Sequence, residues 1–308
     1  MCFACSCKAA RSRLALGVLV AQPGAMDVLE DKMALFMHRV WMRLARRAVR
    51  DAIAQVLGVR KARRSLESIS AELADVIADR MAPYKDALRG VIKNVTSTAY
   101  SFGKKVGLNF GAELHTIPSI RDLADVDTRA IDYLYTNDMF WIGQHWNRDV
   151  RQRIVGAVMR STLLTNVADR YSAAAELQAE FLGQFDKSSA YWETVSAAVV
   201  QRSRNFGLLS GMDEAGVLYV RIANPAPVSA ICKRLVGTQY PISVMIDQRD
   251  AMMEAASPDD VKQLQPWVDE KAIADLKPNS PNFAAELAKR GIAMPPYHGR
   301  CKSTIVAD

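Results

Sequence analysis

The sequence is poor in the residues that mark specialised structural classes. Among 308 residues there are only five cysteines, 16 glycines and 12 prolines. Glycine and proline are too scarce for a collagen-like or low-complexity protein. Five cysteines are too few, and odd in number, for a secreted disulfide scaffold, so a reducing cytosol is the expected environment. Three of them, Cys2, Cys5 and Cys7, lack a nearby histidine, and we expect no metal site there.

Long hydrophobic runs are also missing. No stretch of 18 apolar residues occurs, so we expect no membrane-spanning helix. The apolar segment 14–21 is eight residues long and follows Lys8, Arg11 and Arg13, which loosely resembles an export signal. The alternatives are a basic tail or a true translation start at Met26. We favour the tail, and predict that residues 1–26 are flexible.

The common catalytic and nucleotide-binding motifs are absent from the sequence. There is no Gly-x-Gly-x-x-Gly, no Walker-type Gly-Lys-Ser/Thr loop, no His-Glu-x-x-His and no Gly-x-Ser-x-Gly. We therefore nominate no catalytic residue, and we expect a protein that is not an enzyme.

The composition is that of an ordinary folded protein, with 50% apolar and 24% charged residues. At about 100–200 residues per domain, a chain of this length suggests two domains. The pattern is almost wholly helical up to residue 213 and mixed after it. We predict a mainly α-helical N-terminal domain over 27–213 and a small α+β C-terminal domain over 214–308.

Apolar side chains recur every three or four residues through most of the first domain, which is typical of amphipathic helices. The pattern predicts helices over 30–57, 65–81, 84–110, 127–135, 139–163, 168–184 and 188–207. Ser65 is expected to cap the second helix. Gly103 and Gly107 weaken the prediction for the third helix, because glycine is a poor helix former. Gly207 and Gly211 are expected to end the last one.

The second domain shows short β-like runs separated by turn residues. Residues 217–222 and 242–246 are predicted strands, and three prolines and a glycine lie between them. A third strand, Thr304 to Val306, is expected to pair with an earlier one.

Positive charge is concentrated between His38 and Arg64, in a chain with a net charge of +7. Nine cations lie there with one anion, and the cations are Arg39, Arg43, Arg46, Arg47, Arg50, Arg60, Lys61, Arg63 and Arg64. Most arginines up to Arg50 recur every three or four residues and share one helix face. Such an array suits phosphates, and the lack of aromatic residues on that face indicates sequence-independent nucleic-acid binding. The alternatives are an acidic protein partner and a solvated face.

Sulfur and imidazole groups occur at both ends of the predicted second domain. Cys232 lies near its start, and His298 and Cys301 lie near its end. A structural zinc site takes four ligands, and Ser229 stands where a Cys-x-x-Cys partner of Cys232 would be. We favour a packed core in which the cysteines act as small hydrophobic residues. A weak zinc site and thiol chemistry by a Cys301–His298 couple are the alternatives.

The segment 294–306 reads Met-Pro-Pro-Tyr-His-Gly-Arg-Cys-Lys-Ser-Thr-Ile-Val. It resembles the closing Pro-Pro-x-His-x-x-Cys motif of the phage Mu F-like minor head proteins, also called the phage head morphogenesis family. The upstream runs 219–222 and 231–242 follow the order of the family's strand, cysteine turn and hydrophobic pair. The residues that carry the resemblance are Cys232, Pro295, Pro296, His298 and Cys301, and it covers roughly residues 150–308.

This resemblance implies a component of the virion or procapsid. Such a protein would lie inside the phage head, and in the host cytoplasm during assembly. Its implied partners are the portal protein, capsid or scaffold proteins, and DNA contacted without sequence preference. The implied role is in head assembly or in genome packaging and delivery.

The closing motif also has a purely physical interpretation. Pro295 and Pro296 stiffen the chain, His298 and Cys301 turn inward, and the last strand locks the C-terminus to the strand near Tyr219. We favour this latch over catalysis. The alternative functions are a metal-dependent nuclease or toxin-like enzyme that uses the His/Cys module, and a non-viral nucleic-acid-binding protein.

Overall fold

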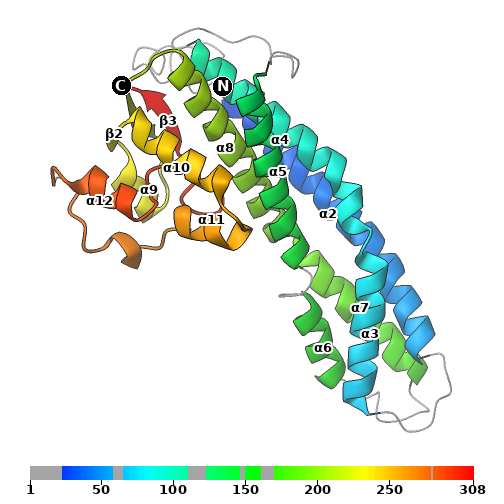
Figure 1. Cartoon of the computed structure of the whole chain (residues 1–308). Coiled ribbons are helices and arrows are strands. Elements are labelled where there is room, and N and C mark those ends of the chain that lie inside the picture. Colours follow the sequence, from blue (N-terminus) through cyan, green and yellow to red (C-terminus); the bar gives the residue numbers. More distant parts are fainter. Residues whose placement is uncertain (1–22, 58–64, 110–122, 146–149, 161–169, 279) are drawn as a thin grey trace, which may run out of the picture. The chain divides into compact units, whose positions relative to one another are not determined.

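The computed structural model describes residues 23–57, 65–109, 123–145, 150–160, 170–278 and 280–308 (Figure 1). Helices form most of this part of the chain, and three short strands lie toward its C-terminal end. The predicted class, mainly helical with a small α+β C-terminal part, is confirmed. The long helices are α2 (Pro23–Leu57), α3 (Leu66–Met81), α4 (Tyr84–Leu108), α5 (Asp125–His145), α6 (Arg151–Arg160), α7 (Arg170–Asp186) and α8 (Ser189–Glu214).

The C-terminal part alternates short strands and short helices. In chain order they are β1 (Tyr219–Ala223), α9 (Ala230–Leu235), β2 (Gln239–Pro241), α10 (Ile242–Glu254), α11 (Pro258–Leu264), the 3₁₀ turn η5 (Lys271–Ile273), α12 (Phe283–Lys289) and β3 (Thr304–Ala307). In the part of the chain that is described, no helix has the length and apolar content needed to cross a membrane.

Helix α2 starts earlier than predicted and stops where predicted. It begins at Pro23, inside the segment 1–26 that we expected to be flexible, and it ends just before Gly58. Proline suits a first helical turn because the amide it lacks would have no helical partner there. Met26 is buried, which gives this turn a packing contact. Residues 1–22 lie outside the described part.

Local sequence signals define α3 accurately. Ser65 is the N-cap, and its hydroxyl accepts a hydrogen bond from the Ser68 amide at 3.2 Å. Hydrogen bonds from its own backbone amide and from Ser65 lower the pKa of Glu67, in the first turn. The helix ends at Met81, before Pro83, as predicted.

Two helix predictions in the middle of the chain are wrong in their boundaries. The helix expected over 127–135 is the beginning of α5, which continues to His145. Buried Leu134 and Ile142 keep an apolar face along it, and no proline interrupts it. The helix expected over 139–163 is divided between the end of α5 and α6.

Glycines let α4 and α8 approach until their backbones touch. The glycines at this crossing are Gly103 and Gly107 on α4 and Gly207 and Gly211 on α8. A Cβ atom added at Gly207 would overlap the backbone oxygen of Tyr100. The prediction that α8 ends at Gly207 is therefore wrong, since these glycines serve close packing and the helix continues to Glu214.

The predicted strand at 242–246 is also wrong. These residues form the first turns of α10, whose buried residues Ile242, Met245 and Met252 follow helical spacing. A short apolar run does not by itself distinguish a strand from a buried helix segment. The strand that exists here is β2, which comes just before it.

The three strands form one antiparallel sheet in the order β2-β1-β3. Val220 lies opposite Tyr240 of β2, and Ile222 lies opposite Ile305 of β3. The side chains of Val220, Ile222 and Ile305 are buried. The C-terminal strand thus pairs with the strand near Tyr219, as the latch interpretation expected.

The chain divides into two compact units. The helical unit comprises Lys32–Ile92 and Asp138–Glu193, and the mixed unit comprises Met1–Asp31, Lys93–Asn137 and Thr194–Asp308, of which only the described residues are discussed. This grouping differs from the domains predicted from sequence. The physical reason is that α8 hydrogen-bonds to the C-terminal loop through Asn205.

The core of the helical unit is aromatic. The Trp41 ring lies 4.8 Å from Tyr84 and 5.3 Å from Trp192, measured between ring centroids. Phe185 lies 5.2 Å from Trp41, and all four side chains are buried. Phe36, also on α2, lies outside this core and is 38% exposed.

Candidate metal centre

The first part of the site is the start of α9. Ser229 is the N-cap of this helix, and its hydroxyl accepts a hydrogen bond from the Cys232 amide at 3.0 Å. This bond places the side chains of Ser229 and Cys232 on the same side of the first turn. The Cys232 thiol is buried there.

The second part is a tight turn that carries His298 and Cys301. The Cys301 amide donates to the His298 carbonyl at 3.2 Å, which closes the turn. Arg300 adopts a φ of 60°, in the left-handed region that non-glycine residues rarely occupy. A Cβ atom at Gly299 would overlap the Thr194 side chain, so any larger residue there would force Thr194 to move.

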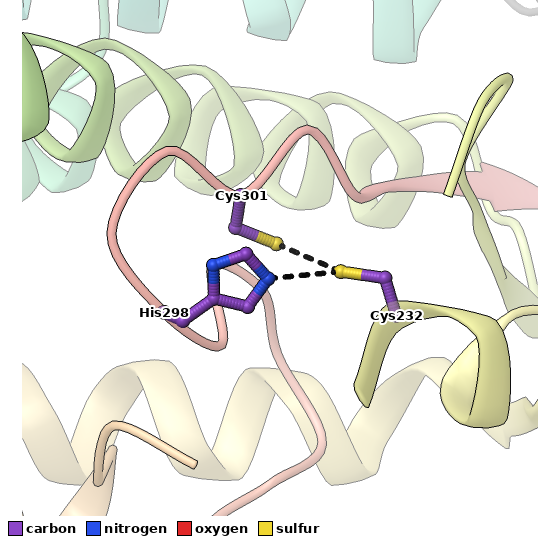
Figure 2. Close-up of side chains that lie close together, drawn as sticks. All are labelled: Cys232, His298 and Cys301. Atoms are coloured by element: carbon purple, nitrogen blue, oxygen red, sulfur yellow. Dashed lines mark hydrogen bonds between the residues drawn. The ribbon is translucent and has the colours of Figure 1, made fainter. Parts of the chain in front are cut away.

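The two parts bring three metal-ligating side chains together. Figure 2 shows the His298 imidazole and the Cys301 sulfur both directed toward the Cys232 sulfur. The Cys232 Sγ atom lies 3.1 Å from His298 Nε2 and 3.7 Å from Cys301 Sγ. All three ligand atoms lie within 4.8 Å of one another. Both cysteines are free thiols.

Hydrogen bonding fixes which imidazole nitrogen faces the sulfurs. The Nδ1 atom of His298 lies 2.7 Å from the Gly299 carbonyl oxygen, which can only accept, so Nδ1 carries the proton. The lone pair of the neutral ring is then on Nε2, 3.0 Å from the Ser229 hydroxyl as well as close to Cys232. The imidazole therefore pairs with Cys232, and the Cys301–His298 couple considered from sequence does not form its hydrogen bond.

The two thiols differ in their acidity. The hydrogen bond from Cys301 lowers the pKa of Cys232 most, and hydrogen bonds with Ser229 and Ser303 add to this against the effect of burial. The same bond, together with burial, raises the pKa of Cys301, which acts as the donor. The pair consequently favours a single thiolate, located on Cys232.

Asn205 on α8 holds the loop that carries the turn. Its amide nitrogen donates to the carbonyls of Pro295 and Ser303 at 3.3 Å each, and its oxygen accepts from the Thr304 hydroxyl at 2.9 Å. It thus binds the loop on both sides of His298. The Pro295–Pro296 peptide bond in this loop is cis.

Two glutamines hold the beginning of the same loop. Gln248 on α10 donates to the Gly291 carbonyl at 2.6 Å and accepts from the Met294 amide at 3.0 Å. Gln265 donates to the Met294 carbonyl at 3.0 Å. Our sequence analysis missed Asn205 and both glutamines, because their partners in this loop are backbone groups 29 to 98 residues away in the chain, which no local pattern contains.

The predicted basic cluster lies partly on the described surface. Five of its arginines are exposed on α2 in the helical unit, and these are Arg39, Arg43, Arg46, Arg47 and Arg50. Asp51 lies 3.8 Å from Arg47 and 3.4 Å from Arg50. The other four predicted cations, Arg60, Lys61, Arg63 and Arg64, fall outside the described residues, as do Cys2, Cys5 and Cys7.

The donor set is chemically suited to a thiolate-preferring divalent ion. Few common cellular ions other than zinc bind well to a set of two cysteine sulfurs and one imidazole nitrogen. A surface hollow of about 420 Å³ lies near α9, but its lining residues, which include Ile231, Arg234 and Lys271, do not include the three ligands. The three side chains are therefore arranged as a closed cluster and not as the wall of this hollow.

Comparison with known proteins gives no relative, since no protein family, curated protein or solved structure matches the chain.

Proposed function

We propose that this chain is a structural protein of phage head morphogenesis, associated with the portal inside the head and active in procapsid assembly or genome packaging and delivery. The observation that carries the proposal is the inward-facing arrangement of the closing motif. Tyr297 and Cys301 are buried, and β3 pairs with β1 directly after them. The motif residues behave as parts of a folded latch that presents a compact module for docking.

The exposed arginines of α2 support a second element of this role, the contact with packaged DNA. Each guanidinium can bind phosphate oxygens in a planar, two-pronged manner, and each phosphate contact releases condensed counterions. Among the described aromatic residues of α2, only Phe36 is exposed, at 38%, so the face offers little stacking surface and no base-edge readout, which favours binding without sequence preference. In the host cytoplasm the same face would contact DNA before or during packaging.

The portal proposal is tested by co-expression with a portal protein from the same genome. We expect the chain to co-purify with the portal oligomer, and to be detected by mass spectrometry in purified particles. A matched variant, Asn205→Ala, should weaken the association because the latch loses its tie to α8. Particles that lack the chain, produced by a host that expresses it, would contradict the proposal.

The DNA contact is tested separately by charge reversal. We expect Arg43→Glu with Arg46→Glu to weaken binding to duplex DNA and to reduce the salt dependence, by about one unit of slope for each phosphate that is no longer bound. The control, Lys262→Glu with Lys289→Glu, makes the same charge change on exposed sites of the mixed unit. Equal losses of affinity in both variants would show a general charge effect and contradict a specific role for α2.

The competing function is a metal-dependent nuclease or toxin-like enzyme that uses the His/Cys module. The closed cluster favours the structural role, because Nε2 and both sulfurs are directed at one another. We expect no DNA or RNA cleavage by the protein, with or without added zinc. Cleavage that is lost in His298→Ala but retained in Arg43→Glu would establish the enzyme instead.

A further inference from the structure

We propose that Cys232, His298 and Cys301 bind one Zn²⁺ ion, with the fourth corner of the coordination sphere at Ser229. The inference concerns the chemistry of the cluster and does not depend on the proposed assembly role. It would make the latch a metal-locked element.

The distances agree with a tetrahedral ion. Zinc–sulfur bonds of about 2.3 Å at tetrahedral angles hold two sulfurs about 3.8 Å apart. The sulfurs of Cys232 and Cys301 are already 3.7 Å apart. The edge from sulfur to imidazole nitrogen would be about 3.5 Å, and the present separation of Cys232 from Nε2 is 3.1 Å. A small outward movement of the ring therefore makes room for the ion.

The imidazole is already oriented as a zinc ligand. Metal-bound histidines almost always donate their second ring N–H to a carbonyl, carboxylate or water, which fixes the tautomer and raises ligand basicity. His298 donates Nδ1–H to the Gly299 carbonyl and directs Nε2 at the sulfurs. The uncommon backbone conformation of Arg300 in the same turn is consistent with a turn held in place for this purpose.

Ser229 occupies the position from which a fourth ligand would come. It is three residues before Cys232 at the beginning of a helix, and its Oγ lies 3.0 Å from His298 Nε2. A neutral hydroxyl is a much weaker zinc ligand than a thiolate. We infer a centre with three strong protein ligands and the Ser229 hydroxyl as a weak fourth ligand.

Binding would release protons and hold together two segments of the mixed unit that are far apart in sequence. Each thiol that ligates zinc gives its proton to the solvent, so affinity falls as the pH is lowered. The ligands come from α9 and from a turn about 66 residues later in the chain. The ion would hold these two segments together and so close the latch on the start of β3.

The test uses the full chain with Cys2→Ser, Cys5→Ser and Cys7→Ser, which removes the competing N-terminal thiols. The protein is stripped with a chelator under reducing conditions and titrated with Co²⁺. We expect one ion per chain, with sulfur-to-cobalt charge-transfer bands and the visible bands of tetrahedral cobalt. Added Zn²⁺ should abolish these bands. Cobalt bands that appear only while the N-terminal cysteines are present would overturn the proposal.

Variants of the site sharpen the result. Cys301→Ala and His298→Ala should each weaken binding by at least about 100-fold. Ser229→Cys should tighten it by at least about tenfold, because a fourth thiolate replaces a weak ligand. An unchanged affinity in Ser229→Cys would contradict the fourth-corner assignment, and this variant is informative even if the alanine variants fold poorly. Portal association is measured independently, so failure of either proposal leaves the other testable.

Discussion

In the helical unit, Trp41, Tyr84 and Trp192 pack ring against ring, whereas in the mixed unit charged and polar side chains are buried in specific pairs. Lys104 binds the carboxylate of Asp127 at 2.5 Å, and Tyr100 donates to the same carboxylate at 2.7 Å. Apolar packing is non-directional and tolerates exchange of similar volumes. Buried polar groups depend on each partner, so the mixed unit should be far more sensitive to small chemical changes.

The largest expected effect is the loss of the buried carboxylate. Asp127→Ala removes the buried partner of Lys104 and leaves it only the half-exposed carboxylate of Glu214, 3.0 Å away. Removing one partner of a buried ion pair costs about 3–5 kcal/mol. Urea denaturation followed by circular dichroism would measure it. The control is Asp132→Ala on the same helix, whose ion pair with Lys93 is more than half exposed on both sides. The control variant should lose less than about 1 kcal/mol of stability. Equal losses of stability in the two variants would contradict a special role for the buried pair.

The same pair predicts a pH dependence. Burial raises the pKa of Asp127, but hydrogen bonds from Lys104 and Tyr100 outweigh it and hold the pKa below its ordinary value of 3.8. A carboxylate of this kind contributes stability above its unfolded pKa and loses it as pH falls through the folded pKa. The difference in the free energy of unfolding between the native chain and the Asp127→Ala variant should therefore become smaller below pH 3.8. A difference that widens in acid would contradict this assignment.

The next effect comes from the glycine crossing. Gly207→Ala places a Cβ against the Tyr100 backbone oxygen, and the helices can relieve the overlap only by moving apart. We expect a loss of about 3 kcal/mol, at the upper end of the cost of overpacking. Gly90→Ala is the matched control on α4, since its Cβ would meet no atom within 4 Å. It should instead stabilise the chain by about 0.5–1 kcal/mol. Thermal unfolding would show a lower melting temperature for Gly207→Ala and a higher one for Gly90→Ala.

A smaller effect is expected where Asn205 binds the C-terminal loop. Asn205→Ala leaves the Pro295 and Ser303 carbonyls without this donor, which costs about 1–3 kcal/mol. Because the loop leads into β3, amide hydrogen exchange should accelerate first in Thr304–Ala307. Exchange that accelerates evenly through the whole chain would contradict a local role for Asn205.

The smallest effect is expected in the helical unit. Leu88 is fully buried there, and Leu88→Met conserves both volume and apolar character. The cost should be under about 1.5 kcal/mol. A loss of stability as large as that of Asp127→Ala, measured by the same urea denaturation, would remove the difference between the two units.

The contrast between apolar packing in the helical unit and specific contacts in the mixed unit also explains which features the sequence could predict. Apolar spacing located the C-terminal end of α2, and the Ser65 cap located the start of α3, because both signals are local. The role of Gly207 depends on a helix about 100 residues earlier in the chain, which no local pattern contains. The prediction of a strand at 242–246 was wrong because a short apolar run fits both a strand and a buried helix.

The candidate site was predictable only in its parts. Spacing identified His298 and Cys301 as a plausible ligand pair, and Cys232 as a more distant third residue. That Cys232 and His298 would lie side by side depends on the pairing of β1 with β3 and on the Asn205 contacts. These contacts join residues far apart in sequence, and the side chains that make them do not recur at a regular spacing that the sequence would reveal.

The glycine crossing also restricts how the two helices can change in length. One inserted residue rotates everything beyond it by about 100° around the helix axis. An insertion between Gly207 and Gly211 would turn one of them away and bring a side chain against the backbone of α4. Viable length variants of this protein should therefore carry insertions in the connections between helices and leave this stretch of α8 intact.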